Sequence, residues 1–230
     1  MPVHRVWPIA AAALCLACLA PGSAQADPQP ISQAETLLFM TYHLKDLQTP
    51  SRLHYAFSKV GTLEKGFSDS VDVDVTDEAD GSKKGVTRFL SGTRQIKFPE
   101  VSHAEGNPVV LYYLEREIRE MARLTGGSAN HFRQRIRAAL AESAQIKNVD
   151  IRFDGQTIAA QQITIAPYES DPNRDRFERL ATKQYVFTLS DQIPGRIYRM
   201  RGHLPVAGQS AKGAAVLDET LTFQSAKPPK

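Results

Sequence analysis

Two long stretches of this sequence alternate apolar and polar residues with a period of two, and a helical stretch separates them. In the first stretch, Val71, Val73 and Val75 fall on one face of an extended segment, while Asp72 and Asp74 fall on the other. Such alternation buries one side of each strand and leaves the other side in water. The pattern therefore predicts an antiparallel sheet with one face that something must cover.

The sequence predicts about nine strands, because β-branched and aromatic residues alternate between turn signals such as Asp154-Gly155 and Pro194-Gly195. A charged excursion at 169–181, with a turn or two of helix after Pro172, interrupts the second stretch. The expected strands are 52–60, 67–75, 85–90, 93–98, 149–153, 157–167, 183–189, 196–204 and 215–223.

The helical stretch begins at Asn107, a good N-cap, with Pro108 in the first helical position and Gly126 as the C-cap. Its expected apolar seam is Leu111, Leu114, Ile118, Met121 and Thr125. A second helix then begins after Ser128 or Asn130, and its seam is Phe132, Ile136, Ala139 and Leu140. The pattern predicts an inserted helical hairpin at about 107–143.

A further helix is expected near the N-terminus. Ser32 and Glu35 have the spacing of a capping box, and apolar residues recur at helical intervals after them. We expect this helix to run from about Gln33 to Asp46, ending before Pro50.

These elements together predict an α+β protein: a strongly curved antiparallel sheet, half-barrel-like, with an N-terminal helix and an inserted helical hairpin. The order of elements resembles that of the periplasmic lipoprotein-carrier family and related envelope proteins. In those proteins a half-barrel of antiparallel strands folds over helices. The resemblance implies a periplasmic, half-barrel fold and carries over no residue roles, since no family motif is matched.

The N-terminus indicates export. His4 and Arg5 form a short positive region, residues 6–20 are mainly apolar, and Ala24-Gln25-Ala26 places small residues at a signal-peptidase site. We expect a cleaved signal peptide at 1–26, a single domain at 27–225 and a frayed tail at 226–230. A rival interpretation makes Cys18 a lipid-attachment site. The predicted location is the periplasm or the exterior of the cell.

The chain beyond residue 26 excludes several kinds of chemistry. Both cysteines, Cys15 and Cys18, lie in the signal segment, so the mature chain offers no disulfide, thiolate nucleophile or cysteine metal ligand. Removing Arg5 lowers the formal net charge from +3 to +2, a bias too small to imply nucleic acid. We expect no nucleic-acid partner, and no apolar run in the mature chain is long enough to cross a bilayer.

No motif fixes a catalytic or metal site. The histidines lack metal-ligand spacing, and the aspartates at 72–80 do not match a calcium loop. Neither a nucleophile elbow nor a phosphate-binding loop is present. We therefore expect no cofactor, no metal and no identifiable catalytic residue, and the chain leans toward a non-enzymatic role.

The hairpin is rich in arginine, and three interpretations of this charge stay open. The arginines could pair with acids of the sheet such as Asp72, Asp74 or Glu169, bind an anionic ligand at the mouth of the half-barrel, or belong to a DNA-reading helix-turn-helix. Arg116, Arg119 and Arg123 are expected to point away from the first helix's seam. The candidate ligand-binding residues are Arg123, His131, Arg133, Arg135 and Arg137.

Three functional hypotheses follow. The first is a non-enzymatic envelope protein that binds a lipid, an acyl chain or another hydrophobic anionic ligand. The second is a structural or protein-interaction module of the cell envelope, with Leu53, Tyr55, Phe57, Phe187 and Tyr198 filling the interior. The third is a hydrolase with His131 or His203 close to an acid and a serine. A large apolar cavity would favour the first, and a packed interior the second.

Overall fold

The computed structural model describes residues 30–204 and 216–228. Ile31–Lys230 form one compact unit of the chain. The signal peptide predicted for residues 1–26 lies outside the described residues.

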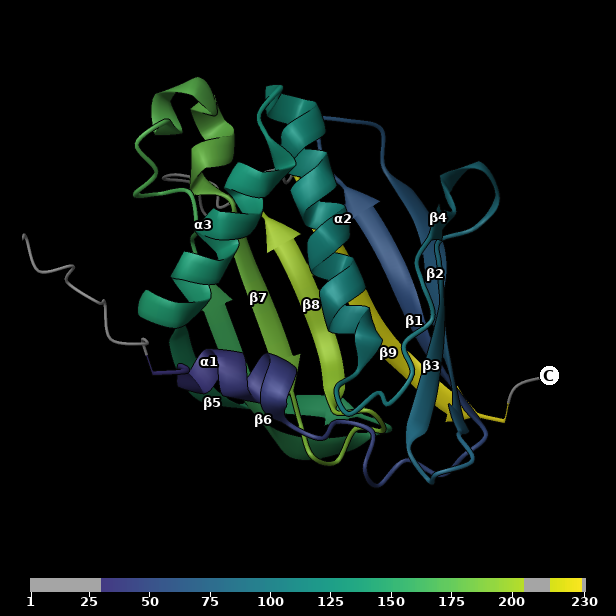
Figure 1. Cartoon of the computed structure of the whole chain (residues 1–230). Coiled ribbons are helices and arrows are strands. Elements are labelled where there is room, and N and C mark those ends of the chain that lie inside the picture. Colours follow the sequence, from purple (N-terminus) through teal and green to yellow (C-terminus); the bar gives the residue numbers. More distant parts are fainter. Residues whose placement is uncertain (1–29, 205–215, 229–230) are drawn as a thin grey trace, which may run out of the picture. The chain divides into compact units, whose positions relative to one another are not determined.

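Nine antiparallel strands form one curved, unclosed sheet, in the order β4-β3-β2-β1-β9-β8-β7-β6-β5 (Figure 1). The first strand pairs with the last, so the two alternating stretches of the sequence meet in the middle of the sheet. The strands are β1 Ser51–Val60, β2 Phe67–Asp77, β3 Lys83–Phe89, β4 Ile96–Lys97, β5 Gln145–Phe153, β6 Gln156–Ile165, β7 Gln184–Leu189, β8 Ile197–His203 and β9 Asp218–Lys227. The predicted half-barrel-like α+β fold is confirmed.

Three helical segments lie on the concave face of this sheet (Figure 1). The hairpin consists of α2, Pro108–Thr125, and α3, Ala129–Glu142. The N-terminal segment is α1, Gln33–Glu35, which continues as one stretch of π-helix, η1, Thr36–Met40. The predicted hairpin is confirmed.

The start and the end of α2 follow the predicted local chemistry. The Asn107 side chain accepts a hydrogen bond from the backbone N–H of Val109, and Gly126 adopts a left-handed conformation with φ of 69°. Ser128 precedes α3 but makes no side-chain capping bond. The predicted α3 seam of Phe132, Ile136, Ala139 and Leu140 is buried.

The alternation of buried and exposed residues that the sequence predicts is present in β2. Val71, Val73 and Val75 are fully buried, whereas Asp72 and Asp74 lie on the opposite face and form ion pairs there. Asp74 pairs with Arg52 and Arg88 of the neighbouring strands. The hairpin arginines therefore do not reach these two acids, and that part of the prediction is wrong.

The structure corrects the lengths of several elements. The N-terminal helix ends at Met40 rather than near Asp46. The expected strand at 93–98 shrinks to β4, because Gly92–Arg94 form a 3-10 turn. Conversely, β9 continues to Lys227, which pairs with Arg52, so the strand enters the region expected to fray. The excursion at 169–181 contains two 3-10 turns, η3 Arg174–Arg176 and η4 Glu178–Thr182.

The predicted orientation of α2 is partly wrong. Leu114, Ile118 and Met121 are buried as expected, but Leu111 is 57% exposed. Arg116, predicted to point to solvent, is buried instead. Tyr112, one helical turn before Arg116, is also buried, and its ring stacks on Phe98. The helix has this wide buried surface because it contacts the sheet, the segment after β4 and α3 at once.

Candidate ligand-binding site

The three helical segments enclose a triangle over the sheet. The α2 and α3 helices are joined at the turn 126–128 and diverge from it, and α1 with η1 crosses the open end (Figure 1). At one corner the Ser32 hydroxyl donates to the carbonyl of Leu140, the end of α3. At the other corner the N–H of Leu44 donates to the carbonyl of Glu105, just before α2. The frame is therefore tied at all three corners.

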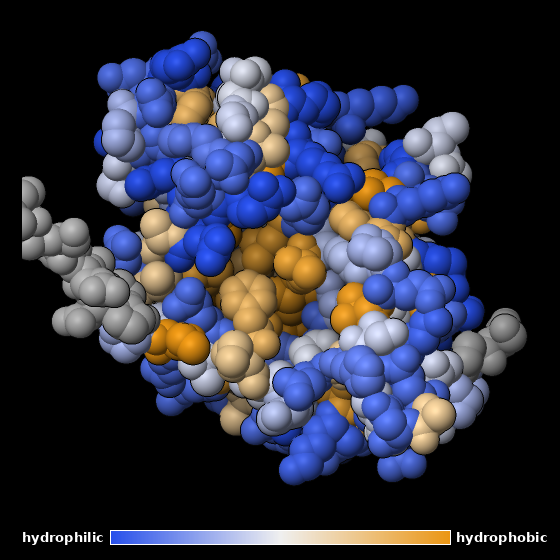
Figure 2. Space-filling model, viewed as in Figure 1, coloured by the Kyte–Doolittle hydropathy of each residue, from blue (hydrophilic) through white to orange (hydrophobic). Residues whose placement is uncertain are grey.

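Apolar side chains gather in a hollow inside this triangle, between α1, α2 and α3 (Figure 2). Three large apolar residues of the framing segments are exposed: Phe39 by 39%, Met40 by 56% and Leu111 by 57%. Leu111 lies one turn before Glu115, which bonds to Arg133 of α3. Because residues four apart share a side of a helix, Leu111 lies on the α3 side of α2. We call this surface the apolar hollow.

A cavity of about 900 Å³ is lined by the N-terminal segment, β5, β6 and the turn between β7 and β8. Its apolar lining includes Leu37, Val149, Ala160 and Leu189. A smaller cavity of about 430 Å³ shares His43, Asp191, Gln192 and Arg196 with it. The polar lining of the larger cavity consists of Thr41, His43, Asn148, Asp150, Gln161, Ser190, Asp191, Gln192 and Arg196. The N-terminal segment thus has exposed residues that frame the apolar hollow and other residues that line a cavity of mixed polarity.

His43 lies in the wall of both cavities and is buried. Its Nδ1 accepts a hydrogen bond of 3.1 Å from the N–H of Asn107, and its Nε2 lies 2.8 Å from the carbonyl oxygen of Leu37. Burial lowers the pKa of His43 below its usual value, and the bond to Leu37 offsets this only in part. The ring is therefore neutral, with its proton on Nε2.

Beneath α2 the interior is filled rather than open. Leu53, Tyr55, Phe57 and Phe187, four of the five residues expected to fill it, are at most 1% exposed. The fifth, Tyr198, is only half-buried and packs against Phe153. The concave face is thus packed under α2 and open beside α1.

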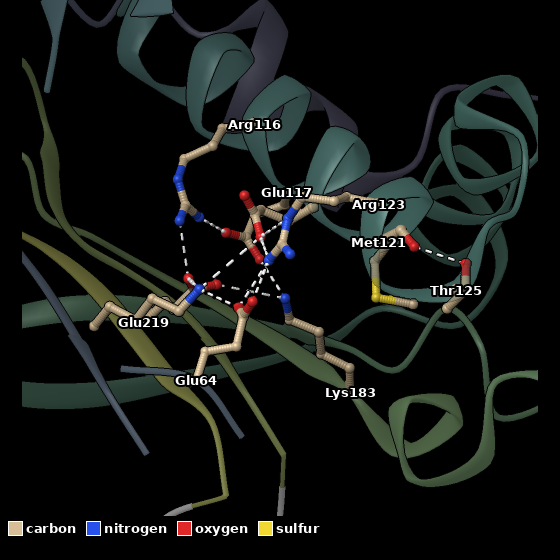
Figure 3. A network of polar contacts seen from close by, with 10 residues as sticks. Glu64, Arg116, Glu117, Met121, Arg123, Thr125, Lys183 and Glu219 are labelled. Carbon is tan, nitrogen blue, oxygen red and sulfur yellow. Dashed lines mark hydrogen bonds and ion pairs between the residues drawn. The ribbon is translucent and has the colours of Figure 1, made fainter. Parts of the chain in front are cut away.

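A network of buried charges lies under the middle of α2 (Figure 3). Arg116 bonds to Glu117 at 2.5 Å and to Glu219 of β9 at 2.9 Å. The ammonium of Lys183, just before β7, lies 2.6 Å from Glu117 and 3.6 Å from Glu219. Lys59 of β1 adds a third cation, 3.2 Å from Glu219. The sequence analysis missed this network because its members are scattered along the chain.

The two buried acids have opposite pKa shifts. For Glu117, complete burial raises the pKa despite the attraction of Lys183 and Arg116. For Glu219, burial alone would raise the pKa, but Arg116, Lys183 and Lys59 outweigh it and hold the pKa far below its usual range. Glu219 is therefore ionised at neutral pH, and the cations around it are held in place.

The five candidate ligand residues do not converge on one point. Arg123 bonds to Glu64 and Glu120 at the outer end of the buried network. Arg133 bonds to Glu115 across the hairpin. His131 and Arg135 meet at the buried carboxylate of Asp171, at 2.7 Å and 3.3 Å. Arg137 is exposed and has no ion pair within residues 30–204 and 216–228.

Arg137 lies close to the apolar hollow. It is one turn beyond Arg133, which faces Glu115, and Leu111 is one turn before Glu115. Because α2 and α3 run antiparallel, both residues lie on the facing sides of the two helices, toward the open end of the triangle. An exposed apolar side chain and an exposed guanidinium are thus presented on the same side of the frame.

The described residues provide little support for catalysis. The pair of His131 and Asp171 meets part of the hydrolase hypothesis, but the neighbouring Ser170 hydroxyl accepts a bond from Arg135 rather than from His131. No group of three metal-ligating side chains occurs among the residues that the structure describes. Within that part of the chain, no helix has the length and apolarity to cross a membrane.

No family model matches the chain, and no curated protein matches it. Solved structures with a similar fold include the lipoprotein LppX of Mycobacterium tuberculosis, at 12% identity and a TM-score of 0.35, covering 82% of this chain and 91% of LppX. MucB matches at 13% identity and a TM-score of 0.34, over 82% of this chain and 57% of that one. A LolA-superfamily protein of Nitrosomonas europaea matches at 9% identity and a TM-score of 0.23, over 86% and 94%.

Proposed function

We propose that this protein is a non-enzymatic periplasmic or secreted envelope protein that binds an acyl chain or lipid in the apolar hollow. The observations that carry the proposal are the apolar hollow between the helices in Figure 2 and the exposure of Phe39, Met40 and Leu111 on the segments that frame it. Contiguous exposed apolar surface marks binding sites in soluble proteins. The adjacent cavity of about 900 Å³ has the volume of a small-molecule site. Export is supported by the signal-peptide pattern of residues 1–26.

The proposal includes an anionic end of the ligand. Arg137 is our first choice among Arg123, His131, Arg133, Arg135 and Arg137, since acids already occupy the other four. A guanidinium suits a carboxylate or phosphate because its planar fork donates two parallel bonds. In this arrangement the ligand's acyl chain contacts Leu111 while its charged end contacts Arg137.

The test is titration of the mature protein with a fluorescent fatty acid. Leu111→Asp should weaken binding at least tenfold, because it places a charge in the path of the acyl chain. The matched control is Val60→Asp: Val60 is similarly exposed, but it follows buried Lys59 on β1 and so points to the opposite, convex face of the sheet. Equal loss in both variants, or no binding by the unmodified protein, would overturn the proposal.

A second titration tests the charged end. Arg137→Gln should weaken binding of the fatty acid but leave binding of its methyl ester unchanged, because the ester has no negative charge. Arg199→Gln serves as the control, since Arg199 is exposed on β8 next to buried Met200 and so points to the opposite, convex face. An equal effect of Arg137→Gln on acid and ester would show that Arg137 does not recognise the charge.

The alternative is a structural or protein-interaction module of the envelope. The observation that favours it is the packed interior beneath α2, where Leu53, Tyr55 and Phe57 are buried. A photo-crosslinking amino acid at position 111 discriminates the two in the native compartment. Crosslinks to lipid support the first proposal, whereas a single defined protein partner supports the module.

A further inference from the structure

The N-terminal segment that lines the cavity makes few hydrogen bonds to the elements that follow it in the chain. We call residues 36–47 the strap. Its end is fixed by the N–H of Leu44, which donates to Glu105, and by the ammonium of Lys83, which donates to the carbonyl of Leu47. Next to Leu44, His43 joins the strap to the beginning of α2 by a side-chain hydrogen bond. Leu38 and Leu44 are buried and fix the strap by packing, whereas Phe39 and Met40 between them are exposed. Between these two leucines, the hydrogen bond of His43 is therefore the side-chain contact that holds the strap to α2.

The contacts of His43 require a neutral ring. Nδ1 accepts a hydrogen bond from the backbone N–H of Asn107, so it carries no proton, and Nε2 donates to Leu37. Protonation of Nδ1 would set one N–H against another at 3.1 Å. The ring is only 3% exposed, so water is not available to replace the lost bond.

Asn107 transmits this contact to other elements. Its side chain caps α2 and donates to the Tyr55 hydroxyl of β1 and to the carbonyl of Gly195, in the turn between β7 and β8. His43 therefore binds the strap to a residue that is itself fixed by three elements. Asn107 is therefore fixed in place, so the strap is the part that moves when the hydrogen bond between Asn107 and His43 is lost.

The charges around His43 do not favour its cation. Arg196, in the turn between β7 and β8, faces it and opposes protonation, while Asp191 in the same turn favours protonation. Asp191 is exposed and pairs with Arg196 at 3.1 Å, and Asp46 of the strap pairs with Arg196 at 3.5 Å. Glu105, before α2, is exposed and contributes its backbone carbonyl. The acids near His43 are thus solvated, and two of them are paired.

We propose that His43 is a proton-operated clasp, which in its neutral form holds the strap against α2 and on protonation loosens the strap between Leu38 and Leu44, so that the cavity lined by Thr41 and His43 widens. The device rests on the proposed function, since Phe39 and Met40 of the same stretch belong to the apolar hollow. It provides for ligand entry or release in an acidic environment, such as an acidified periplasm or medium.

The direction of the pH dependence follows from linkage. The open strap leaves His43 with an ordinary pKa of about 6.5, and the closed strap lowers this pKa. The contribution of His43 to closure is complete above the open-state pKa and is lost as the pH falls through the closed-state value. Between the two values, the equilibrium constant for opening rises by up to about tenfold per pH unit.

Hydrogen exchange of the mature protein without ligand tests the clasp. After correction for intrinsic exchange rates, amides of residues 36–44 should lose protection by up to about tenfold per pH unit below pH 6.5. In His43→Asn, an amide oxygen replaces Nδ1 as acceptor for Asn107 and does not titrate, so this pH dependence should vanish. His103→Asn is the control, because His103 is exposed and lies outside the strap. Urea unfolding of each variant confirms that the fold is intact.

The outcomes separate the clasp from the proposed function. Protection of 36–44 that is constant with pH in the unmodified protein, or equally pH-dependent in His43→Asn, overturns the clasp. Fluorescent fatty acid titrations at pH 7.5 and pH 5 then address the ligand. If the protein shows pH-dependent protection of the strap yet binds no fatty acid at either pH, that result overturns the proposed function but supports the role of His43 as a clasp.

Discussion

The concave face of this sheet is covered by packed side chains in one region and is left open in another. Under the middle of α2 it is packed, and buried charges join Arg116 and Glu117 to the sheet residues Lys183 and Glu219. Beside α1 and η1 the same face is left open, with exposed apolar side chains and a cavity of about 900 Å³. The difference shows that one sheet can anchor a helix, α2, through buried contacts in one region and leave an apolar surface exposed to ligand in another.

The two ends also differ in what a substitution should cost. A buried charge network is sensitive to loss of a single member, because the partner is left uncompensated in a medium of low polarity. An exposed apolar residue contributes little to folding, because it is already in contact with water. Substitutions in the two regions should therefore separate stability from binding.

The largest effect is expected for Lys183→Met. Lys183 is fully buried and bonds to Glu117, so its removal leaves the buried carboxylates of Glu117 and Glu219 with one cation fewer beneath α2. The free energy of unfolding should fall by about 3–5 kcal/mol, measured by urea denaturation. Arg119→Met, at an exposed arginine of the same helix, should change it by less than about 0.5 kcal/mol. Similar losses in both would show that the network does not act as a buried unit.

The comparison can be made within one helix. Met121→Ala creates a cavity in the packed region and should lower the free energy of unfolding by about 2–5 kcal/mol. Leu111→Ala, at the apolar hollow, should lower it by less than about 0.5 kcal/mol while weakening the binding of a fluorescent fatty acid. If Leu111→Ala destabilises as much as Met121→Ala, the hollow is part of the core.

The caps of the two hairpin helices should differ as well. Asn107→Ala removes the N-cap bond of α2 and a partner of the buried Tyr55 hydroxyl, so a loss of about 2 kcal/mol is expected. Ser128 makes no capping bond, so Ser128→Ala should cost less than about 0.5 kcal/mol. Thermal unfolding followed by circular dichroism measures both. Equal costs would mean that the Asn107 contacts do not anchor α2.

The smallest effect is expected for Arg133→Met. This arginine joins α3 to Glu115 of α2, but both side chains are partly exposed to water. Pairs of this kind contribute less than about 1 kcal/mol, and salt screens them. Urea denaturation at low and high salt measures the difference. A loss well above 1 kcal/mol would indicate that the hairpin depends on this pair to keep its geometry.

Sequence reasoning succeeded where the signal is local. The alternation of Val71, Val73 and Val75 predicted β2 and its buried face, and Asn107 and Gly126 predicted the limits of α2. These features depend on strand periodicity and on helix capping, which adjacent residues determine. Of the candidate site, the sequence predicted the hairpin arginines and an apolar groove between the sheet and the helices. It did not predict that Phe39, Met40 and Leu111 would be exposed there, nor the contacts of His43.

The α2 helix shows why the remainder was missed. The expected seam was drawn from apolar residues at helical spacing, so it placed Leu111 in the core and left Arg116 in solvent. In the structure Leu111 is exposed and Arg116 is buried. The burial of Arg116 depends on Glu219, which lies 103 positions away in the chain. The contact of His43 with Asn107 spans 64 positions, and no periodicity links the two.

The sequence by itself determined the nine-strand alternation, the helical hairpin and its caps, because each depends on interactions between neighbouring residues. Only the tertiary structure decided which face of α2 is buried and where the concave side stays open. The physical reason is that burial depends on what packs against a residue, and for α2 that includes β9 and the residue preceding β7, both far away in the chain.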